Sequence, residues 1–130
     1  MVVKGILDNK CFGDVDSIQV LTKGDYQILN GVNFAGKIHI LNYQTHQLIF
    51  ISGWVSNLNM GAWQTKAICS IPKSYLRFSN LSNMILSPAE YFDSNAALGG
   101  YMDGPTREVR ATTRAKSVDA TQFNLLEIAY

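Results

Sequence analysis

The sequence predicts an all-β domain, an antiparallel β-sandwich or barrel of eight to nine short strands with at most one short helical turn. Apolar and polar residues alternate with a period of two along much of the 130-residue chain. β-Branched and aromatic residues lie between turn signals rich in Gly, Asn and Asp. A chain of this length normally forms one domain and buries about two-thirds of its unfolded surface. We therefore expect a single domain over residues 1–130.

The first three expected strands cover residues 17–21, 26–29 and 36–42. Glycine-containing turns separate them, because glycine adopts the positive φ angles that tight turns need. In the third strand Ile38 and Ile40 occupy one face, and His39 and Leu41 occupy the other. This alternation predicts a strand with one buried face.

Residues 48–56 form the best candidate for a central strand, because both of its faces are apolar. One face carries Leu48, Phe50 and Trp54, and the other carries Ile49, Ile51 and Val55. We expect Trp54 to pack in the core. For Trp63, core and surface positions stay equally open.

Four further strands are expected at 63–71, 81–86, 97–102 and 108–115. Pro72 ends the first of them, since proline has no N–H to give a sheet ladder. Gly99 and Gly100 weaken the third. Between the second and third, residues 87–90 match a helix start, with an N-cap serine, a proline at the first helical position and a glutamate three residues after the cap.

The strand at 108–115 is expected to be half-buried. Its two faces hold Val109, Ala111, Thr113 and Ala115 on the buried side, and Glu108, Arg110, Thr112 and Arg114 on the polar outer side. The end of the chain, 123–130, fits a final strand or a closing helix capped by Ser117. We favour the strand because the preceding turn is polar and the segment is short.

The composition disfavours two classes of partner. A net charge of +1 and only 16% charged residues leave no electrostatic footprint for a nucleic-acid backbone. No apolar run reaches the roughly 18 residues that a membrane-spanning helix needs, and the first residues lack the apolar core of a signal peptide. We expect a protein made in the cytosol, whose neutral polar surface suits hydrogen-bonding contacts or burial in an assembly.

Groups for catalysis or metal binding are sparse. His39 and His46 are the two histidines and flank an expected hairpin, and no nucleophile elbow, zinc-protease motif or phosphate-binding glycine loop is present. Close pairs of Asp and Asn at 14–16 and 93–95 are explained by turns. We therefore expect no enzyme, no metal and no cofactor.

The two cysteines, Cys11 and Cys69, have no partner at metal-ligand spacing. Each is expected to be a small reduced hydrophobe. A disulfide between them stays open at this stage.

A binding role has positive support. The C–H faces of sugars stack on aromatic rings, and Asp, Asn and Arg bind sugar hydroxyls through directional hydrogen bonds. Residues of these types are concentrated at 54–63 and 91–114. From them we select the candidate contact set Trp63, Tyr91, Asp93, Tyr101, Asp103, Arg107 and Arg110.

Three segments, 48–57, 61–63 and 71–77, carry a resemblance to a known family. A hydrophobic strand ending in Ser-Gly, a loop, and an Ile-Pro-Lys-Ser-Tyr-Leu-Arg element resemble the C-terminal head domains of phage tail-fibre and baseplate receptor-binding proteins. The similarity is to phages of lactic-acid bacteria and related Gram-positives. Ser74 stands where that family has glycine, and Phe78 where it has proline.

The resemblance implies a homotrimeric β-sandwich or barrel at the tail tip or baseplate of a virion. Such a protein binds a host cell-wall saccharide or teichoic-acid-type polymer without catalysis and contacts other tail or baseplate proteins, with no nucleic acid and no membrane insertion. The alternatives are a structural virion or assembly protein without a ligand, and a small polysaccharide hydrolase using carboxylates such as Asp93 and Asp103.

Overall fold

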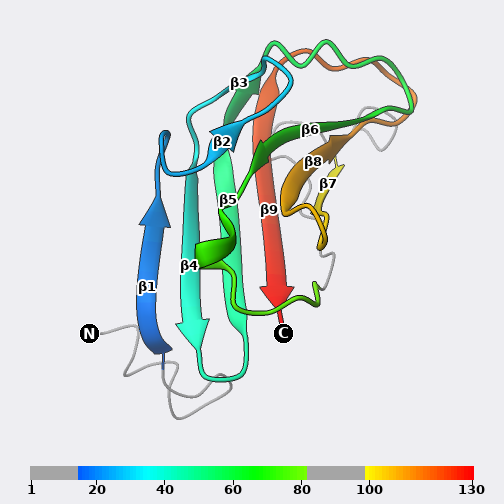
Figure 1. The fold of residues 1–130 in the computed structure, drawn as a ribbon. Helices are drawn as coiled ribbons and strands as arrows, with labels where there is room; N and C mark the ends of the chain where they lie inside the picture. Colours follow the sequence, from blue (N-terminus) through cyan, green and yellow to red (C-terminus); the bar gives the residue numbers. More distant parts are fainter. Residues whose placement is uncertain (1–14, 82–98) are drawn as a thin grey trace.

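The computed structural model describes residues 15–81 and 99–130 (Figure 1). Within them the chain forms nine strands and one 3-10 helix: β1 (Val15–Leu21), β2 (Gln27–Ile28), β3 (Asn33–Phe34), β4 (Lys37–Tyr43), β5 (Gln47–Ser56), β6 (Thr65–Ser70), η1 (Lys73–Tyr75), β7 (Gly99–Met102), β8 (Glu108–Thr112) and β9 (Thr121–Ala129). All strand pairings are antiparallel. The predicted all-β class is confirmed.

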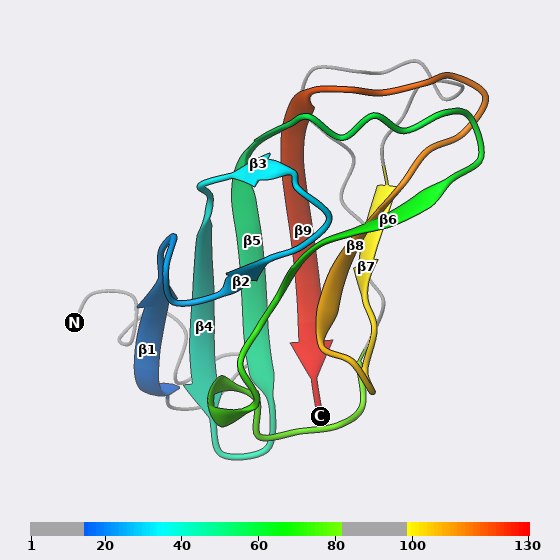
Figure 2. The ribbon, with the colours of Figure 1, turned by 45° about the horizontal axis from the view of Figure 1, so that its top comes forward.

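The strands form two sheets. The large sheet has the order β1-β4-β5-β9, with β3 paired to the last residues of β5 beyond the end of β4. The small sheet has the order β2-β6-β8-β7. Figures 1 and 2 show the small sheet lying across one face of the large sheet. The molecule is therefore a sandwich, and β5 is central in the large sheet, as the sequence predicted.

The core lies between the sheets and follows the period-two pattern. Its most buried members are apolar residues of both sheets, namely Ile38, Ile40, Ile49, Ile51, Val55, Ile68, Met102, Val109, Ala111, Phe123 and Leu125. Each of them is at most 1% exposed. The expected division of β4 is confirmed, because Ile38 and Ile40 face the core while His39 and Leu41 are only partly buried.

The two sheets approach closely where Gly100 of β7 meets Phe123 of β9. A Cβ on Gly100 would lie 2.6 Å from Cζ of the Phe123 ring and 2.9 Å from the Arg110 carbonyl oxygen. Real Cβ contacts are not that short, so the ring fits only because residue 100 has no side chain. Glycine at this position thus serves packing, besides lowering strand propensity.

The outer face of β5 corrects one prediction. Trp54 was expected in the core, but it is 51% exposed, and Phe50 on the same face is 38% exposed. The small sheet covers only the inner face of the large sheet, where Ile49 and Ile51 lie. An apolar pattern on both faces marked a central strand correctly, but it did not mean that one chain covers both faces.

Of the remaining expectations, some are confirmed, some are wrong, and some lie outside the described residues. The final segment is a strand, β9, and not a helix. Ala115, expected on the buried face, is exposed because β8 ends at Thr112. The short strand β3 and the helix η1 were not predicted. The expected helix start at 87–90 and the expected strand at 81–86, apart from Leu81, lie outside the described residues.

A buried glutamine fastens the segment after β6 to the large sheet. Gln47 is fully buried, and its amide nitrogen donates to Asn42 Oδ1 at 2.7 Å and to the Tyr75 carbonyl at 2.9 Å. Its Oε1 accepts the Arg77 N–H at 3.0 Å. Asn42 continues the network to Ser17 and to Gln19 on β1. Polar groups of the segment at η1 are thereby paired by direct hydrogen bonds within the chain.

Cys69 is a free, fully buried thiol on β6. Burial raises its pKa to about 12, so the reactive thiolate is suppressed. This agrees with its expected role as a small hydrophobe, while Cys11 lies outside the described residues. Across residues 15–81 and 99–130, no helix is long and apolar enough to cross a membrane.

Candidate functional site

The turn between β7 and β8 is built around Asp103. The Asp103 N–H donates to the Glu108 carbonyl at 2.9 Å, and the Arg107 N–H donates to the Asp103 carbonyl at 2.7 Å. The Asp103 carboxylate accepts the Thr106 hydroxyl at 2.6 Å and the Thr106 N–H at 3.2 Å. Arg107 has a φ of 57°, which the tight turn imposes. Side chain and backbone together hold the turn in one conformation.

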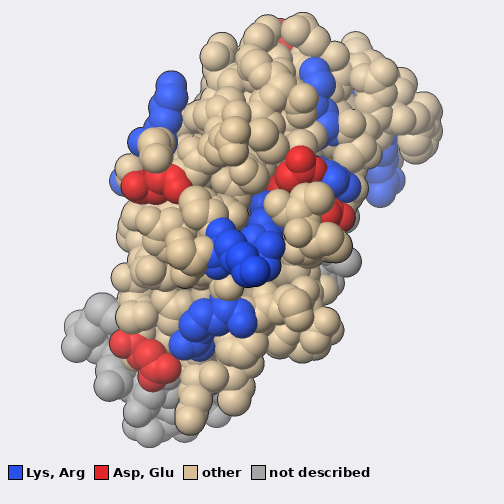
Figure 3. Space-filling view, in the orientation of Figure 1, with Lys and Arg blue, Asp and Glu red and all other residues tan. Residues whose placement is uncertain are grey.

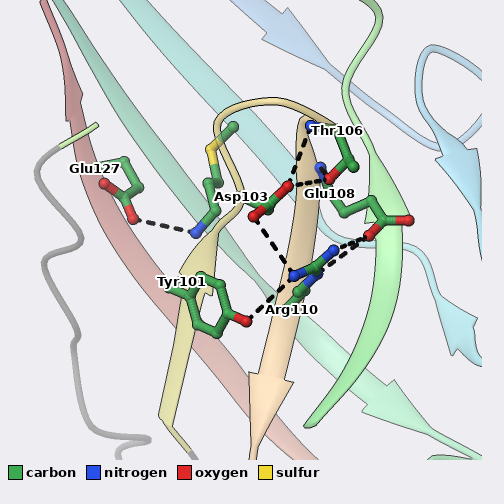
Figure 4. Close-up of polar contacts among 7 residues, drawn as sticks. Tyr101, Asp103, Thr106, Glu108, Arg110 and Glu127 are labelled. Carbon is green, nitrogen blue, oxygen red and sulfur yellow. Dashed lines mark hydrogen bonds and ion pairs between the residues drawn. The ribbon is translucent and has the colours of Figure 1, made fainter. Parts of the chain in front are cut away.

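Arg110 lies at the centre of a polar cluster on this hairpin. The β7–β8 register places it opposite Tyr101, whose hydroxyl accepts from Nη1 at 3.3 Å. Nε and Nη2 donate to Oε1 of Glu108 at 3.1 and 2.7 Å, and Nη1 is 3.5 Å from Oδ1 of Asp103. Figure 4 shows these groups converging on the guanidinium. We call Tyr101, Asp103, Glu108 and Arg110 the hairpin cluster.

The charges of the hairpin cluster stabilise one another. Hydrogen bonds from the Thr106 hydroxyl and N–H, with Arg110 nearby, hold the pKa of Asp103 below its ordinary value of 3.8. Hydrogen bonds to Tyr101 and Glu108, together with Asp103, raise the pKa of Arg110. The Arg110 side chain is 26% exposed, so the cluster is accessible to solvent. The lowered pKa of Asp103 and the raised pKa of Arg110 keep this pair charged at neutral pH.

These groups can exchange hydrogen bonds with a neutral polyol. Two carboxylates surround one guanidinium, so the cluster offers both acceptor oxygens and N–H donors to hydroxyl groups and carries no excess of positive charge. In Figure 4 the second Glu108 oxygen points away from Arg110. On the face viewed in Figure 3, Lys and Arg side chains form small groups interrupted by Asp and Glu, without a continuous basic surface. The arrangement suits sugar hydroxyls better than a polyanion.

The candidate contact set is only partly brought together. Tyr101 and Asp103 both contact the guanidinium of Arg110. Arg107 belongs to the same turn, where its backbone N–H donates to the Asp103 carbonyl. Tyr91 and Asp93 lie outside the described residues. Trp63 lies beyond the other end of β8, where its N–H donates to the Arg114 carbonyl at 2.8 Å.

Trp63 is presented to solvent by a well-fixed loop between β5 and β6. Its side chain is 74% exposed, which settles the open choice between core and surface. Asn57 donates to the Gly31 carbonyl, the Asn59 N–H donates to Asp119, and Lys66 donates to the Leu58 carbonyl. Arg114 follows Arg110 by four residues, on the order of 13 Å of extended chain. An extended polymer would be needed to contact both places.

Two residues of the candidate site, Glu108 and Thr106, were not among the residues predicted from the sequence. Glu108 binds Arg110 most closely, and Thr106 fixes Asp103. A signal existed for Glu108, because it was placed on the outer face of its strand together with Arg110, two residues apart. Thr106 follows Asp103 by three residues, a spacing typical of turns in which a carboxylate accepts from the backbone.

The histidines do not join a catalytic group in the described residues. His46 stacks on the Tyr43 ring with centroids 4.7 Å apart, and His39 lies on β4. Within residues 15–81 and 99–130, no three His, Cys, Asp or Glu side chains are grouped as metal ligands.

The turn around Asp103 is expected to depend on pH. Since folding lowers the pKa of Asp103, its ionised form stabilises the turn above about pH 4, and this contribution disappears as the pH falls through the lowered pKa. A carboxyl titration followed by NMR should give a midpoint below 3.8. In Thr106→Val the midpoint should rise toward 3.8, because the hydroxyl donor is lost while the N–H stays. A wild-type midpoint at or above that value would contradict the geometry.

No protein-family model and no curated protein sequence matches this chain. Its fold is similar to the crystal structure of the receptor binding protein gp15 of Listeria phage PSA, with a TM-score of 0.62 and 14% sequence identity. The similar region covers 88% of this chain and 66% of the phage protein, so this chain spans about two thirds of that protein's length. The likeness of fold confirms the resemblance to phage receptor-binding proteins that the sequence predicted.

Proposed function

We propose that this chain is a receptor-binding domain of a phage tail or baseplate protein, and that it binds a host cell-surface saccharide without catalysis. The observation that carries the proposal is the similarity in fold, over 88% of the chain, to a phage receptor binding protein. The hairpin cluster supplies the place for the ligand. In this reading the domain belongs to the virion tail and contacts other tail proteins.

The hairpin cluster can bind sugar hydroxyls in two ways. The carboxylates of Asp103 and Glu108 accept hydrogen bonds from hydroxyl groups, and Arg110 donates to hydroxyl or ring oxygens. The bonds within the cluster hold its members in position before a ligand arrives, which lowers the entropy lost on binding. Trp63 offers a flat apolar face for a sugar ring further along the polymer.

A single site of this kind binds weakly, because water competes for each exposed hydrogen bond. Three sites in a homotrimer, and many trimers on a virion, turn later binding events into intramolecular ones and raise the overall avidity. We therefore include a homotrimer in the proposal.

Removing Arg110 tests the site. Arg110→Gln is expected to weaken retention on purified cell walls of Listeria and of lactic-acid bacteria by about 10- to 100-fold, because charge-assisted hydrogen bonds contribute about 1.5–3 kcal/mol. Tyr101→Ala and Trp63→Ala should also reduce retention while the circular dichroism spectrum stays unchanged. Lys23→Gln, which removes an exposed cation from the turn after β1, is the matched control.

Two outcomes would count against the proposal. Unchanged retention of the Arg110 and Trp63 variants would exclude these residues as the receptor site. Release of soluble saccharide from walls by the wild-type chain, lost in Asp103→Asn, would favour a hydrolase instead.

A further inference from the structure

The outer face of the large sheet, turned away from the small sheet, is unusually apolar for an exposed surface. The described residues include six exposed large hydrophobic side chains, and four of them lie here: Ile18, Val20, Phe50 and Trp54. Their exposed fractions range from 38% to 51%. Isolated surface hydrophobics are common, but a gathering of them on one face indicates an interaction surface.

The strand register makes three of these side chains contiguous, those of Ile18, Val20 and Phe50. Trp54 lies beyond the polar row of Lys37, Ser52 and Asn124. Val20 of β1 is opposite His39 of β4, His39 is opposite Phe50 of β5, and Phe50 is opposite Leu126 of β9. These four outward side chains form one row across four strands. The next row contains Ile18, Leu41 and Leu48. We call these two rows the apolar face.

The apolar face continues into a region that is already packed. Val15, Tyr43 and Leu48 form a second hydrophobic cluster, separate from the main core, with Leu41 against it. Their exposed fractions are 9%, 1% and 9%. One end of the outer face is therefore buried, and the other end is open at Val20, Phe50 and Trp54.

Charge is excluded from the middle of this face. Asp16 and Lys37, on β1 and β4, lie at or next to the first residue of their strands, and β5 has no charged residue. Glu127 on β9 is fully buried and accepts the Met102 N–H on the inner side. Depletion of charge at the centre, with polar groups such as Ser52 and Gln122 at the rim, is typical of the core of a protein–protein interface.

The exposed area is of the size that such an interface needs at its centre. Half-exposed side chains of this kind present roughly 100 Å² each, since a whole aromatic side chain buries about 150–250 Å². The three exposed members of the two rows, Ile18, Val20 and Phe50, together give on the order of 300 Å², over a third of the roughly 800 Å² that each partner buries in a standard interface. The partly buried row members and the polar rim can provide the rest.

We propose that the apolar face is the contact between copies of this chain, so that in the trimer three large sheets face a common axis. A second copy brings an equally apolar sheet face with no charged residue at its centre, and apolar sheet faces pack well on one another. A saccharide would require several hydrogen-bonding groups, and in the row of Val20, His39, Phe50 and Leu126 only the His39 side chain can supply one. The number of copies, three, rests on the proposed function. The assignment of the apolar face as the contact between copies does not depend on it.

This arrangement leaves the hairpin cluster accessible. Arg110 and Glu108 lie on the outer face of the small sheet, opposite in the sandwich to the apolar face of the large sheet. Copies that join through their large sheets therefore direct their hairpin clusters away from the axis. One side of each sandwich serves assembly, and the other is free for the receptor.

Light scattering of the full chain over a range of concentrations tests the proposal. The wild type should be an oligomer at micromolar concentration. Phe50→Lys and Val20→Lys should each weaken association at least about 100-fold, because a charge would be buried without a partner. Trp63→Lys, the same kind of change at an exposed aromatic residue outside the face, should leave the size unchanged. Circular dichroism checks folding, and Ile18→Lys, at an exposed position in the second row of the face, replaces any variant that fails to fold.

The outcomes separate this inference from the proposed function. A monomeric wild type, or an oligomer that none of the lysine variants disrupts, would overturn the role of the apolar face. A dimer that the lysine variants disrupt would support the face and contradict the trimer. Arg110→Gln should keep the oligomer and lose wall retention, so loss of receptor binding cannot be mistaken for loss of assembly.

Discussion

Replacing Phe123 with alanine is expected to lower the free energy of unfolding by about 3–5 kcal/mol. Phe123 is 1% exposed and lies in the main core between the two sheets. Its ring fills the space left by the missing side chain of Gly100. Because Gly100 is held by the β7–β8 ladder, the strands cannot simply move in to close the cavity. Chemical denaturation at one fixed protein concentration measures the loss, since association of copies would make stability depend on concentration.

The contact with Gly100 makes this prediction specific. Gly100→Ala alone should destabilise the protein, because the new Cβ would lie 2.6 Å from the Phe123 ring. In the Phe123→Ala background the same change should cost less, leaving mainly the approach to the Arg110 carbonyl. The two sites should therefore show a non-additive free energy of unfolding.

Trp63→Ala is the control for removing an aromatic side chain, because Trp63 is 74% exposed and should change stability by less than about 0.5 kcal/mol. Equal losses for Phe123→Ala and Trp63→Ala, or strict additivity of the Gly100 and Phe123 changes, would show that the sheets do not meet at this point.

The strands and their inner faces could be predicted from the sequence because a period of two is a local property. The alternation of Ile38 and Ile40 with His39 and Leu41 needs no knowledge of distant residues. The same holds for Ile49 and the other inward residues of β5. The short strand β3 escaped prediction, since its two residues are too few to show a period. β2 is equally short but lies within the strand expected at 26–29.

Whether the second apolar face of β5 is buried or exposed could not be predicted from the sequence. Trp54 and Phe50 alternate correctly with the inner residues of β5, but the pattern is identical whether their face is covered by the same chain or by another copy. The small sheet lies across the inner face, and among the described residues Trp54 and Phe50 remain 51% and 38% exposed on the outer face.

The candidate site was predictable where it depends on one hairpin. Tyr101, Asp103 and Arg110 are close in sequence, and a turn at 103–107 brings them together whatever the rest of the fold. Trp63 reaches its place through a long loop and pairing with the segment after β8, so its distance from Arg110 depends on tertiary structure that the local pattern does not contain.

Replacing Gln47 with leucine is expected to lower the free energy of unfolding by about 2–4 kcal/mol. Leucine is of similar size, so little cavity is created and the loss comes from hydrogen bonds. The Tyr75 carbonyl, the Arg77 N–H and Asn42 Oδ1 would all lose the partner that Gln47 supplies. Each polar group left unpaired in a buried place costs about 1–3 kcal/mol, and local movement that lets water reach these groups reduces the sum.

The local consequence should be seen at one amide. Hydrogen exchange of the Arg77 N–H should accelerate in Gln47→Leu, because its acceptor Oε1 is gone. Gln122→Leu is the matched control, since Gln122 donates on the outer face of the same sheet, is only partly buried, and should change stability by less than about 1 kcal/mol. If both variants lose the same stability and Arg77 exchanges as in the wild type, Gln47 does not fasten this segment. If only Gln47→Leu is affected, a buried amide that no sequence pattern marks is what holds the chain after η1 against the large sheet.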